Sequence, residues 1–282
     1  MDNAVRIVEV GPRDGLQNEP TIVPTSDKIA LINLLSSSGL QSIEVSSFVS
    51  PKWVPQLADA ADVFAGIERR AGVRYVALVP NMMGLERAIE AGVGEVAVFA
   101  SASEPFSMKN TNGTIPEVLE RLREVAKASP VPVRGYVSCI DSDPYAGEVT
   151  PDAVQRVGEE LLEMGCYEVS LGDTTGKAPK ERMDQLLQHL LRTLSADRLA
   201  GHFHDSTDTA LENVEVALAH GLRVFDAAVG GLGGCPYAPG AKGNLSSLKL
   251  IEFLETKGFE TGVDGSVVAK AGQMVQSWKE NT

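Results

Sequence analysis

The sequence predicts an α/β protein, a (β/α)8 TIM barrel with a short extra helix at its C-terminal end. Three observations carry this prediction. Eight short β-branched runs recur along the 282 residues, with amphipathic stretches between them. Each unit has about 35 residues, enough for a strand, a loop and a helix. No Gly-x-Gly-x-x-Gly follows the first run and no Gly-Lys-Ser/Thr motif occurs, which favours a closed barrel over a doubly wound open sheet.

The runs are nearly continuous in apolar character on at least one side, as expected for parallel strands that are covered on both faces. In chain order, strands are predicted at Arg6–Val10, Ser42–Phe48, Arg74–Pro80, Glu95–Ala100, Val133–Cys139, Glu168–Asp173, Leu199–His204 and Val224–Val229.

Helix signals separate the strands. Helices are predicted to start at Thr25–Asp27, at Thr114 and at Thr150, the last two with a proline in the first turn. Three more starts are expected near Pro179, Ser206 and Asn244, and helix ends at Gly39, Gly92, Gly165 and Gly221. No linker divides the chain. We therefore expect residues 1–282 to form one catalytic domain, with the barrel over about 5–260 and a helical tail over about 264–282.

Composition and charge exclude several classes. Apolar residues make up 43% of the chain, enough for a large core, so the chain is not intrinsically disordered. The net charge of −13 and a pI near 4.8 argue against a nucleic-acid partner. Three cysteines fit a reducing compartment. There is no secretory or mitochondrial presequence pattern and no apolar stretch of roughly 20 residues. A cytoplasmic protein without membrane segments is expected.

The most informative polar pair is His202 and His204. Residues two apart on a strand face the same way, so at a barrel strand end both imidazoles can converge on one metal. Two core histidines are the alternative reading. Asp14 after the first strand and Asn244 after the last are plausible oxygen ligands, because these strands become neighbours when the barrel closes. Such donors suit Mg²⁺ or Mn²⁺. Asn244 could instead cap the next helix, or do both.

A glycine-rich run from Gly230 to Gly240 follows the last strand and carries Cys235. A loop of this kind can close over a ligand, and a thiol in its middle could donate a proton or be redox-sensitive. An inert small residue in a tight turn is the alternative. Cys139 and Cys166 are expected to be buried.

Several long motifs resemble those of the 3-hydroxy-3-methylglutaryl-CoA (HMG-CoA) lyase family. The similarity runs from about Val5 to Gly262. It includes Val8-Glu9-Val10-Gly11-Pro12-Arg13-Asp14-Gly15-Leu16-Gln17-Asn18-Glu19, Ser47-Phe48-Val49-Ser50-Pro51-Lys52-Trp53-Val54-Pro55-Gln56, Ser170-Leu171-Gly172-Asp173-Thr174 and Gly230-Gly231-Leu232-Gly233-Gly234-Cys235-Pro236-Tyr237-Ala238.

The resemblance implies a metal-dependent retro-Claisen cleavage of HMG-CoA to acetyl-CoA and acetoacetate, as in leucine degradation and ketone-body formation, and a homodimer. It places the metal, Mg²⁺ or Mn²⁺, on Asp14, His202, His204 and Asn244. The implied catalytic residues are Arg13, Asp14, Glu44, Asp173, His202 and Cys235. Of these, Arg13 would stabilise enolate charge, Asp173 and Glu44 would serve acid/base and positioning roles, and Cys235 would help protonate the enolate. The acyl-CoA substrate would contact Arg13, Gln17, Ser47 and Lys52.

The chain departs from the family pattern on three loops, at 142–144, 175–179 and 206–209. These loops follow the fifth, sixth and seventh strands, so the substrate is less well specified than the reaction. A lyase for a citramalyl-type or longer branched 3-hydroxyacyl-CoA is the main alternative. A Claisen-condensing synthase is less favoured, because such chains usually carry further C-terminal domains. A non-catalytic metal- or CoA-binding barrel is disfavoured by the complete set of site residues.

Overall fold

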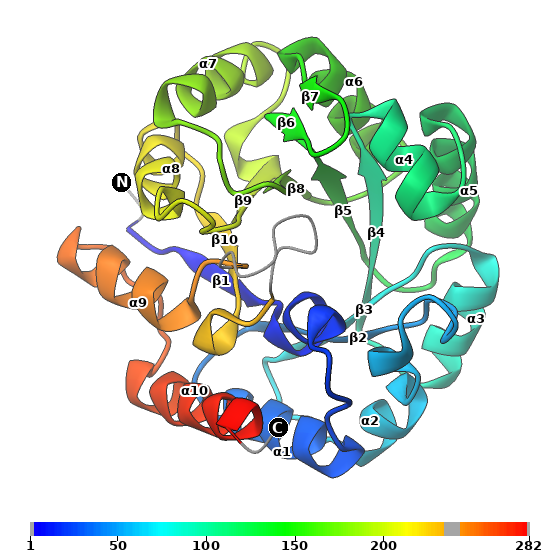
Figure 1. Cartoon of the computed structure of the whole chain (residues 1–282), viewed down its shortest axis with the longest axis vertical. Helices are drawn as coiled ribbons and strands as arrows, with labels where there is room; N and C mark the ends of the chain where they lie inside the picture. Colours follow the sequence, from blue (N-terminus) through cyan, green and yellow to red (C-terminus); the bar gives the residue numbers. More distant parts are fainter. Residues whose placement is uncertain (1–2, 234–242, 281–282) are drawn as a thin grey trace.

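The structure is a computed structural model that describes residues 3–233 and 243–280. Eight parallel strands close into a barrel in the order β1-β10-β9-β8-β5-β4-β3-β2, and helices surround it (Figure 1). The barrel strands are β1 (Arg6–Glu9), β2 (Ser42–Ser47), β3 (Arg74–Leu78), β4 (Glu95–Ser101), β5 (Val133–Ser138), β8 (Val169–Asp173), β9 (Leu199–Phe203) and β10 (Val224–Ala227). All eight predicted strands and the TIM-barrel class are confirmed.

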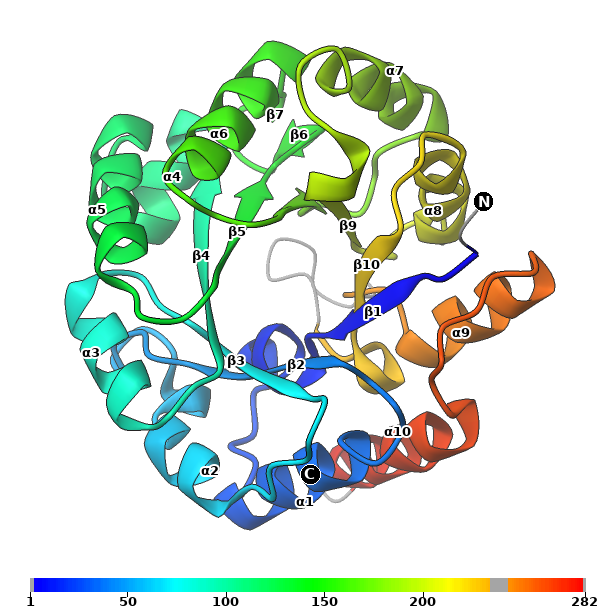
Figure 2. The same ribbon diagram turned by 180° about the vertical axis from the view of Figure 1, so that it is seen from behind.

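The helices form an outer ring that is also visible from behind (Figure 2). They are α1 (Thr25–Leu35), α2 (Ala60–Gly66), α3 (Met82–Glu90), α4 (Glu104–Thr111), α5 (Ile115–Ala128), α6 (Pro151–Glu163), α7 (Lys180–Leu190), α8 (Ala210–Ala219), α9 (Ser247–Thr256) and α10 (Gly265–Glu280). Helix α10 is the expected extra helix. It packs against α1, α9 and the turn after β10. The organisation of the whole chain as one domain stays a prediction.

The predicted helix signals act largely as expected. Thr114 caps α5 in a capping box with Glu117, and the Thr150 side chain accepts from the Ala153 amide at the start of α6. The four predicted end glycines all have positive φ, from 72° at Gly92 to 110° at Gly165. That conformation is strained for residues with a Cβ, so glycine ends these helices at little cost.

Some expectations need correction. Helix α8 begins at Ala210, later than Ser206 suggested, and the residue before α9 is Ser246, so Asn244 is not the cap of that helix. A small antiparallel hairpin, β6 (Ser142–Asp143) with β7 (Gly147–Glu148), follows β5 and was not predicted. A two-residue strand gives too short a pattern to show a period.

The core lies both inside the barrel and between barrel and helices. Cys139 and Cys166 are fully buried in it, as expected, and burial raises the pKa of each thiol to about 12. In the described part of the chain, no helix combines the length and the apolar character that crossing a bilayer demands.

Candidate active site

The loop after β1 brings two adjacent charged side chains to the carboxyl end of the barrel. Residues Gly11–Gly15 form a single π-helical turn, in which the amides of Arg13, Asp14 and Gly15 all donate to the Val10 carbonyl. Such one-turn π elements are rare and occur often at functional sites. The turn places Arg13 and Asp14 at the mouth of the barrel, where barrel enzymes have their active sites.

His202 lies on β9 and His204 directly follows it. Their ring centroids are 5.4 Å apart, so both rings are on one face, as the two-residue spacing predicted. The Nε2 atoms of both rings lie 3.9 Å from Asp14 Oδ2. The three potential ligand atoms are within 4.8 Å of one another, which makes this cluster able to hold a metal ion.

Asn244 joins the cluster through its backbone and its side chain. It forms an antiparallel bridge with His204, and its amide Nδ2 donates to Asp14 Oδ2 at 2.7 Å. The backbone at Gly243 passes very close to Gly233: a Cβ atom on Gly243 would lie only 1.0 Å from the carbonyl oxygen of Gly233. Glycine at 243 therefore permits the approach that carries Asn244 to the site. The four predicted metal-ligand positions are thus brought together.

Arg13 is buried between two carboxylates. Its Nη1 donates to Asp14 Oδ1 at 2.6 Å, and its Nη2 donates to Glu44 Oε2 at 3.0 Å. The hydroxyl of Tyr136 on β5 also donates to Glu44 Oε2, at 2.9 Å. Glu44 comes from β2 and is fully buried. The guanidinium is therefore fixed in position and charge before any substrate binds.

Burial and neighbouring charges shift the pKa values of Asp14 and His204. Burial would raise the pKa of Asp14, but the charges of Arg13 and the two imidazoles outweigh it, and the pKa falls to about 2. Burial, followed by the charge of the neighbouring His202, lowers the pKa of His204 to about 4. At neutral pH, Asp14 is a carboxylate and His204 a neutral imidazole, the forms in which both bind metals.

His202 has a second partner that sequence reasoning missed. Its Nδ1 lies 3.1 Å from Oδ2 of Asp226 on β10. Asp226 also accepts two hydrogen bonds from Arg134 on β5. Burial would raise the pKa of Asp226, but the charge of Arg134 and the contact with His202 hold it well below its usual range. Arg134 and Tyr136 stand two apart on one strand, a spacing that could have drawn attention to them.

Glu9 on β1 is a further buried group outside the predicted set. Its Oε1 accepts from the amides of Gly11 and Val229, and its Oε2 accepts from the Ser247 hydroxyl at 2.6 Å. It thereby ties the loops after β1 and β10 and the start of α9 to one another. A charged residue between Val8 and Val10, within the predicted strand, was the signal available in the sequence.

We expect the Glu9→Gln variant to change how stability depends on pH. Burial raises the pKa of Glu9 from 4.5 to about 7, against the opposing hydrogen bonds from Ser247, Val229 and Gly11. A raised carboxyl pKa stabilises the fold below pH 4.5, and this contribution is lost as the pH rises through 7. Between pH 5 and 8 the loss is roughly 2–3 kcal/mol.

Glutamine can keep the same acceptor oxygen without ionising. The free energy of unfolding of Glu9→Gln, relative to that of wild type, should therefore be roughly 2–3 kcal/mol higher at pH 8 than at pH 5. Urea unfolding of both proteins at the two pH values measures this difference. If the unfolding free energies of wild type and variant changed by the same amount between pH 5 and pH 8, the raised pKa of Glu9 would be contradicted.

The other predicted residues lie at or near the same end of the barrel. Asp173, the last residue of β8, accepts from the amides of Gly176 and Ala178, so these hydrogen bonds lie within its own loop; burial raises its pKa to about 6. Gln17 donates to Asp14 Oδ1, Ser47 is buried at the end of β2, and Lys52 is exposed on the following loop. Cys235 lies outside the described residues.

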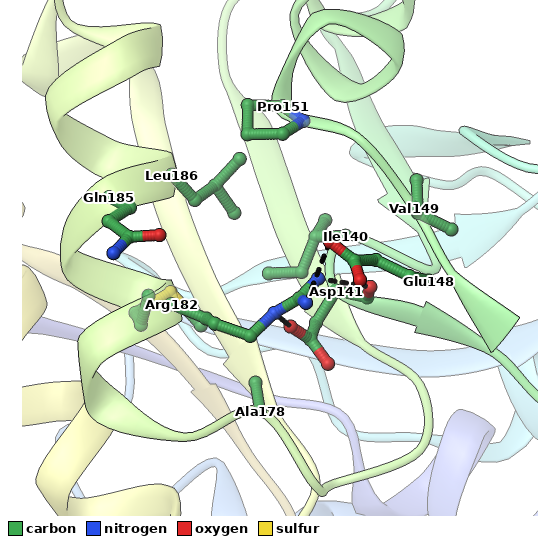
Figure 3. A pocket seen from close by; sticks show the side chains of 10 residues that line it. Ile140, Asp141, Glu148, Val149, Pro151, Ala178, Arg182, Gln185 and Leu186 are labelled. Carbon is green, nitrogen blue, oxygen red and sulfur yellow. Dashed lines mark hydrogen bonds and ion pairs between the residues drawn. The ribbon is translucent and has the colours of Figure 1, made fainter.

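The hairpin after β5 is anchored at the rim by residues other than Asp14, His202 and His204. Arg182 of α7 reaches Asp141 and Glu148, with Nε donating to Asp141 Oδ1 at 2.5 Å (Figure 3). The small cavity beside them, about 70 Å³, is lined by Ile140, Val149, Pro151 and Leu186 among others. It contains none of the predicted site residues and is too small for an acyl-CoA. We infer that these ion pairs hold the hairpin against helix α7 and have a structural role.

Comparisons with known proteins show which family and which relatives the chain resembles. The sequence profile of the family described as HMGL-like matches residues 4–275. A Pseudomonas aeruginosa protein named 3-hydroxy-3-isohexenylglutaryl-CoA/hydroxy-methylglutaryl-CoA lyase is 52% identical over 96% of this chain and 91% of its own length. The hydroxymethylglutaryl-CoA lyase of Pseudomonas mevalonii is 48% identical over 97% of this chain and 92% of its own.

Two solved structures share the fold closely. The crystal structure of an HMG-CoA lyase from Brucella melitensis has a TM-score of 0.97 and 54% identity, covering 98% of this chain and 99% of the other. An HMG-CoA lyase from Acinetobacter baumannii, in complex with coenzyme A and 3-methylmalate, has a TM-score of 0.93 and 38% identity, covering 98% and 91%.

Proposed function

This chain belongs to the HMGL-like family, and from that premise we propose that it is a divalent-metal-dependent carbon–carbon lyase that cleaves HMG-CoA to acetyl-CoA and acetoacetate. The observation that carries the proposal is the convergence of Asp14, His202 and His204 within 4.8 Å, with Arg13 bonded to the same carboxylate. Relatives about half identical over nearly the whole chain are named for this reaction.

The donor set fits a hard divalent cation. Asp14, His202 and His204 would hold it through a carboxylate oxygen and two imidazole nitrogens, with no thiolate among them. Asn244, whose Nδ2 donates to Asp14 Oδ2 in this structure, would add its Oδ1 after rotation of the side-chain amide. We propose Mg²⁺ or Mn²⁺, with water completing the coordination. Such a cation supplies positive charge that favours loss of the proton from the tertiary hydroxyl of the substrate. The carboxylate state of Asp14 and the neutral state of His204 make the site ready to receive it.

Two electron pairs move in the reaction. The hydroxyl loses its proton to a base, for which Asp173 is the proposed group, and the electron pair of the broken O–H bond forms the new carbonyl of acetoacetate. The neighbouring carbon–carbon bond breaks, and its electron pair passes to the thioester fragment as an enolate. A proton added to the enolate carbon completes acetyl-CoA. Arg13 is suited to stabilise the enolate, because its guanidinium is already fixed by Asp14 and Glu44 and needs no reorganisation during the reaction.

Further roles follow from the contacts. Glu44 positions Arg13, together with the Tyr136 hydroxyl that shares its Oε2. Asp173 shapes the loop after β8, and its raised pKa keeps an acid/base role within the proposal. Gln17, Ser47 and Lys52 are proposed to contact the substrate with Arg13. Cys235 is retained as the proposed proton donor to the enolate.

Polar contacts among the loops after β5, β8 and β9 are the reason to keep a second substrate class beside HMG-CoA. Ser142 and Thr175 hydrogen-bond to each other at 2.9 Å, and Thr207 donates to the Gly176 carbonyl. These contacts join the three loops on which the chain departs from the family pattern. The Pseudomonas aeruginosa relative is named for two acyl-CoA substrates with different branches. We therefore keep a different 3-hydroxyacyl-CoA, citramalyl-type or longer branched, as the alternative.

Metal-dependent turnover tests the function directly. With Mn²⁺ or Mg²⁺, the protein should convert HMG-CoA to acetoacetate, and dialysis against a chelator should remove the activity until metal is restored. The measurement is acetoacetate formation over a panel of 3-hydroxyacyl-CoA thioesters. No acetoacetate with either metal, or activity indifferent to chelation, would contradict the proposal. A much higher kcat/KM for another thioester would select the alternative substrate.

Three properties stay predictions. The homodimer and a role in leucine degradation and ketone-body formation are implied by the resemblance. The cytoplasmic location is expected from the cysteine content and from the lack of a presequence pattern. Among the relatives, some carry cytoplasmic and others mitochondrial in their names, so the comparisons leave the compartment open to direct localisation.

A further inference from the structure

The two histidines of the cluster differ on the side that faces away from Asp14. His202 Nδ1 lies 3.1 Å from Asp226 Oδ2, whereas His204 Nδ1 is buried with no hydrogen-bond partner among the residues that the structure describes. The ring of Tyr136 also packs edge-on against His202, with centroids 5.9 Å apart. One imidazole is therefore held from its far side and the other is not.

The partner of His202 is itself rigidly held. Asp226 Oδ1 accepts from Arg134 Nη2 at 2.7 Å, and its Oδ2 accepts from Arg134 Nη1 at 3.2 Å and from the Ser170 hydroxyl at 2.8 Å. The ion pair joins β5 to β10, which are not neighbours in the barrel. Because every one of these partners donates, both oxygens of Asp226 act as acceptors. The hydrogen between Asp226 and His202 must then belong to Nδ1.

The Arg134 side chain is itself held in place by burial and by further hydrogen bonds. It is 1% exposed, and its Nε donates to Glu168 Oε1 at 2.7 Å while Nη1 also donates to the Tyr136 hydroxyl. Buried ion pairs of this kind are often no more stabilising than apolar side chains of the same size. Stability alone therefore does not explain why the barrel interior carries this pair where it meets His202.

We propose that Asp226, held by Arg134, is a positioning residue that fixes the Nδ1–H tautomer and the ring orientation of His202, so that Nε2 faces the cation site. The inference rests on the proposed function for the cation, and it assigns Asp226 and Arg134 a role toward it. Carboxylates that orient metal-binding histidines typically change metal affinity by 10–100-fold when replaced.

The first test compares substitutions of Asp226 and Glu168, the two carboxylates that pair with Arg134. In Asp226→Asn, the amide oxygen is drawn to Arg134, so the amide nitrogen faces His202 and donates to Nδ1. The tautomer then inverts and puts a hydrogen on Nε2. We expect Mn²⁺ affinity of the full-length protein, measured by electron paramagnetic resonance, to fall about 10–100-fold.

Glu168→Gln is the matched control. Glu168 is 3% exposed and pairs with Arg134, but none of its contacts is with His202. We expect this variant to bind Mn²⁺ within about twofold of wild type. Equal losses in the two variants, or no loss in Asp226→Asn, would overturn the proposal.

A second test uses the wild-type protein and therefore does not depend on whether an Asp226 variant folds. Long-range ¹H–¹⁵N spectra of the metal-free, full-length protein distinguish the two imidazole tautomers of each histidine. His202 should carry its hydrogen on Nδ1, while His204, without a partner, serves as the comparison in the same spectrum. Burial lowers the pKa of His202, but the contact with Asp226 outweighs it and raises the pKa, so the spectra are recorded at alkaline pH, where the ring is neutral and carries one hydrogen. A neutral ring with its hydrogen on Nε2 would overturn the proposal. Both tests read the cation site without substrate, so failure to cleave HMG-CoA would leave their outcome unaffected.

Discussion

Replacing His204 with alanine should abolish turnover of HMG-CoA while the barrel stays folded. His204 Nε2 is 3.9 Å from Asp14 Oδ2, so the ring supplies one of the few donors to the proposed cation. A bound metal contributes several kcal/mol of charge stabilisation, so its loss lowers kcat by about 10³-fold or more. The fold should tolerate the change, because His204 Nδ1 makes no hydrogen bond in the described part of the chain.

The measurement is initial-rate kinetics with saturating Mn²⁺, together with circular dichroism melting. His189→Ala is a suitable control, since His189 lies on α7 and contacts Asp152, a largely exposed residue remote from the cluster. The control should keep its activity. Near-normal turnover in His204→Ala would refute the assignment of His204 as a ligand, and a collapsed melting curve would instead show that the ring is needed for folding.

The sequence specified the barrel because its strands are short, buried and β-branched, and because each helix end carries a local signal. Gly39, Gly92, Gly165 and Gly221 each need a positive φ, which is a property of one residue and its neighbours. Local chemistry of this kind can be read without the fold. The position of His202 and His204 on one face follows from the strand period in the same way.

The missed residues have partners that only barrel closure supplies. Arg134 and Asp226 are 92 residues apart, as are Tyr136 and Glu44, and each pair crosses the barrel interior. No pattern along the chain shows which strand will lie opposite. For the same reason Asn244 could be taken for a helix cap: its amide reaches Asp14 only because residues 243–245 run beside His204.

The second large effect is expected at Arg13. In Arg13→Lys the charge is kept, but a single ammonium group cannot reproduce the fork that bonds Asp14 at 2.6 Å and Glu44 at 3.0 Å. If the guanidinium stabilises the enolate, the loss falls on the transition state. We expect kcat to decrease by about 10²–10³-fold, as for the removal of one oxyanion donor, with KM changed by only about threefold.

Arg74→Lys separates this effect from the general cost of changing a barrel arginine. Arg74 on β3 also pairs with a buried glutamate, Glu95, at 3.0 Å, but neither residue contacts the cluster around Asp14. Because Arg13 is buried and Arg74 is partly exposed, Arg13→Lys should show the larger decrease in melting temperature, and only Arg13→Lys should lose kcat. If KM rises while kcat is kept, Arg13 binds substrate and transition state equally, and enolate stabilisation must come from another group. A loss of kcat in Arg74→Lys of the same size would show that the barrel frame, and not the guanidinium at the mouth, limits the reaction.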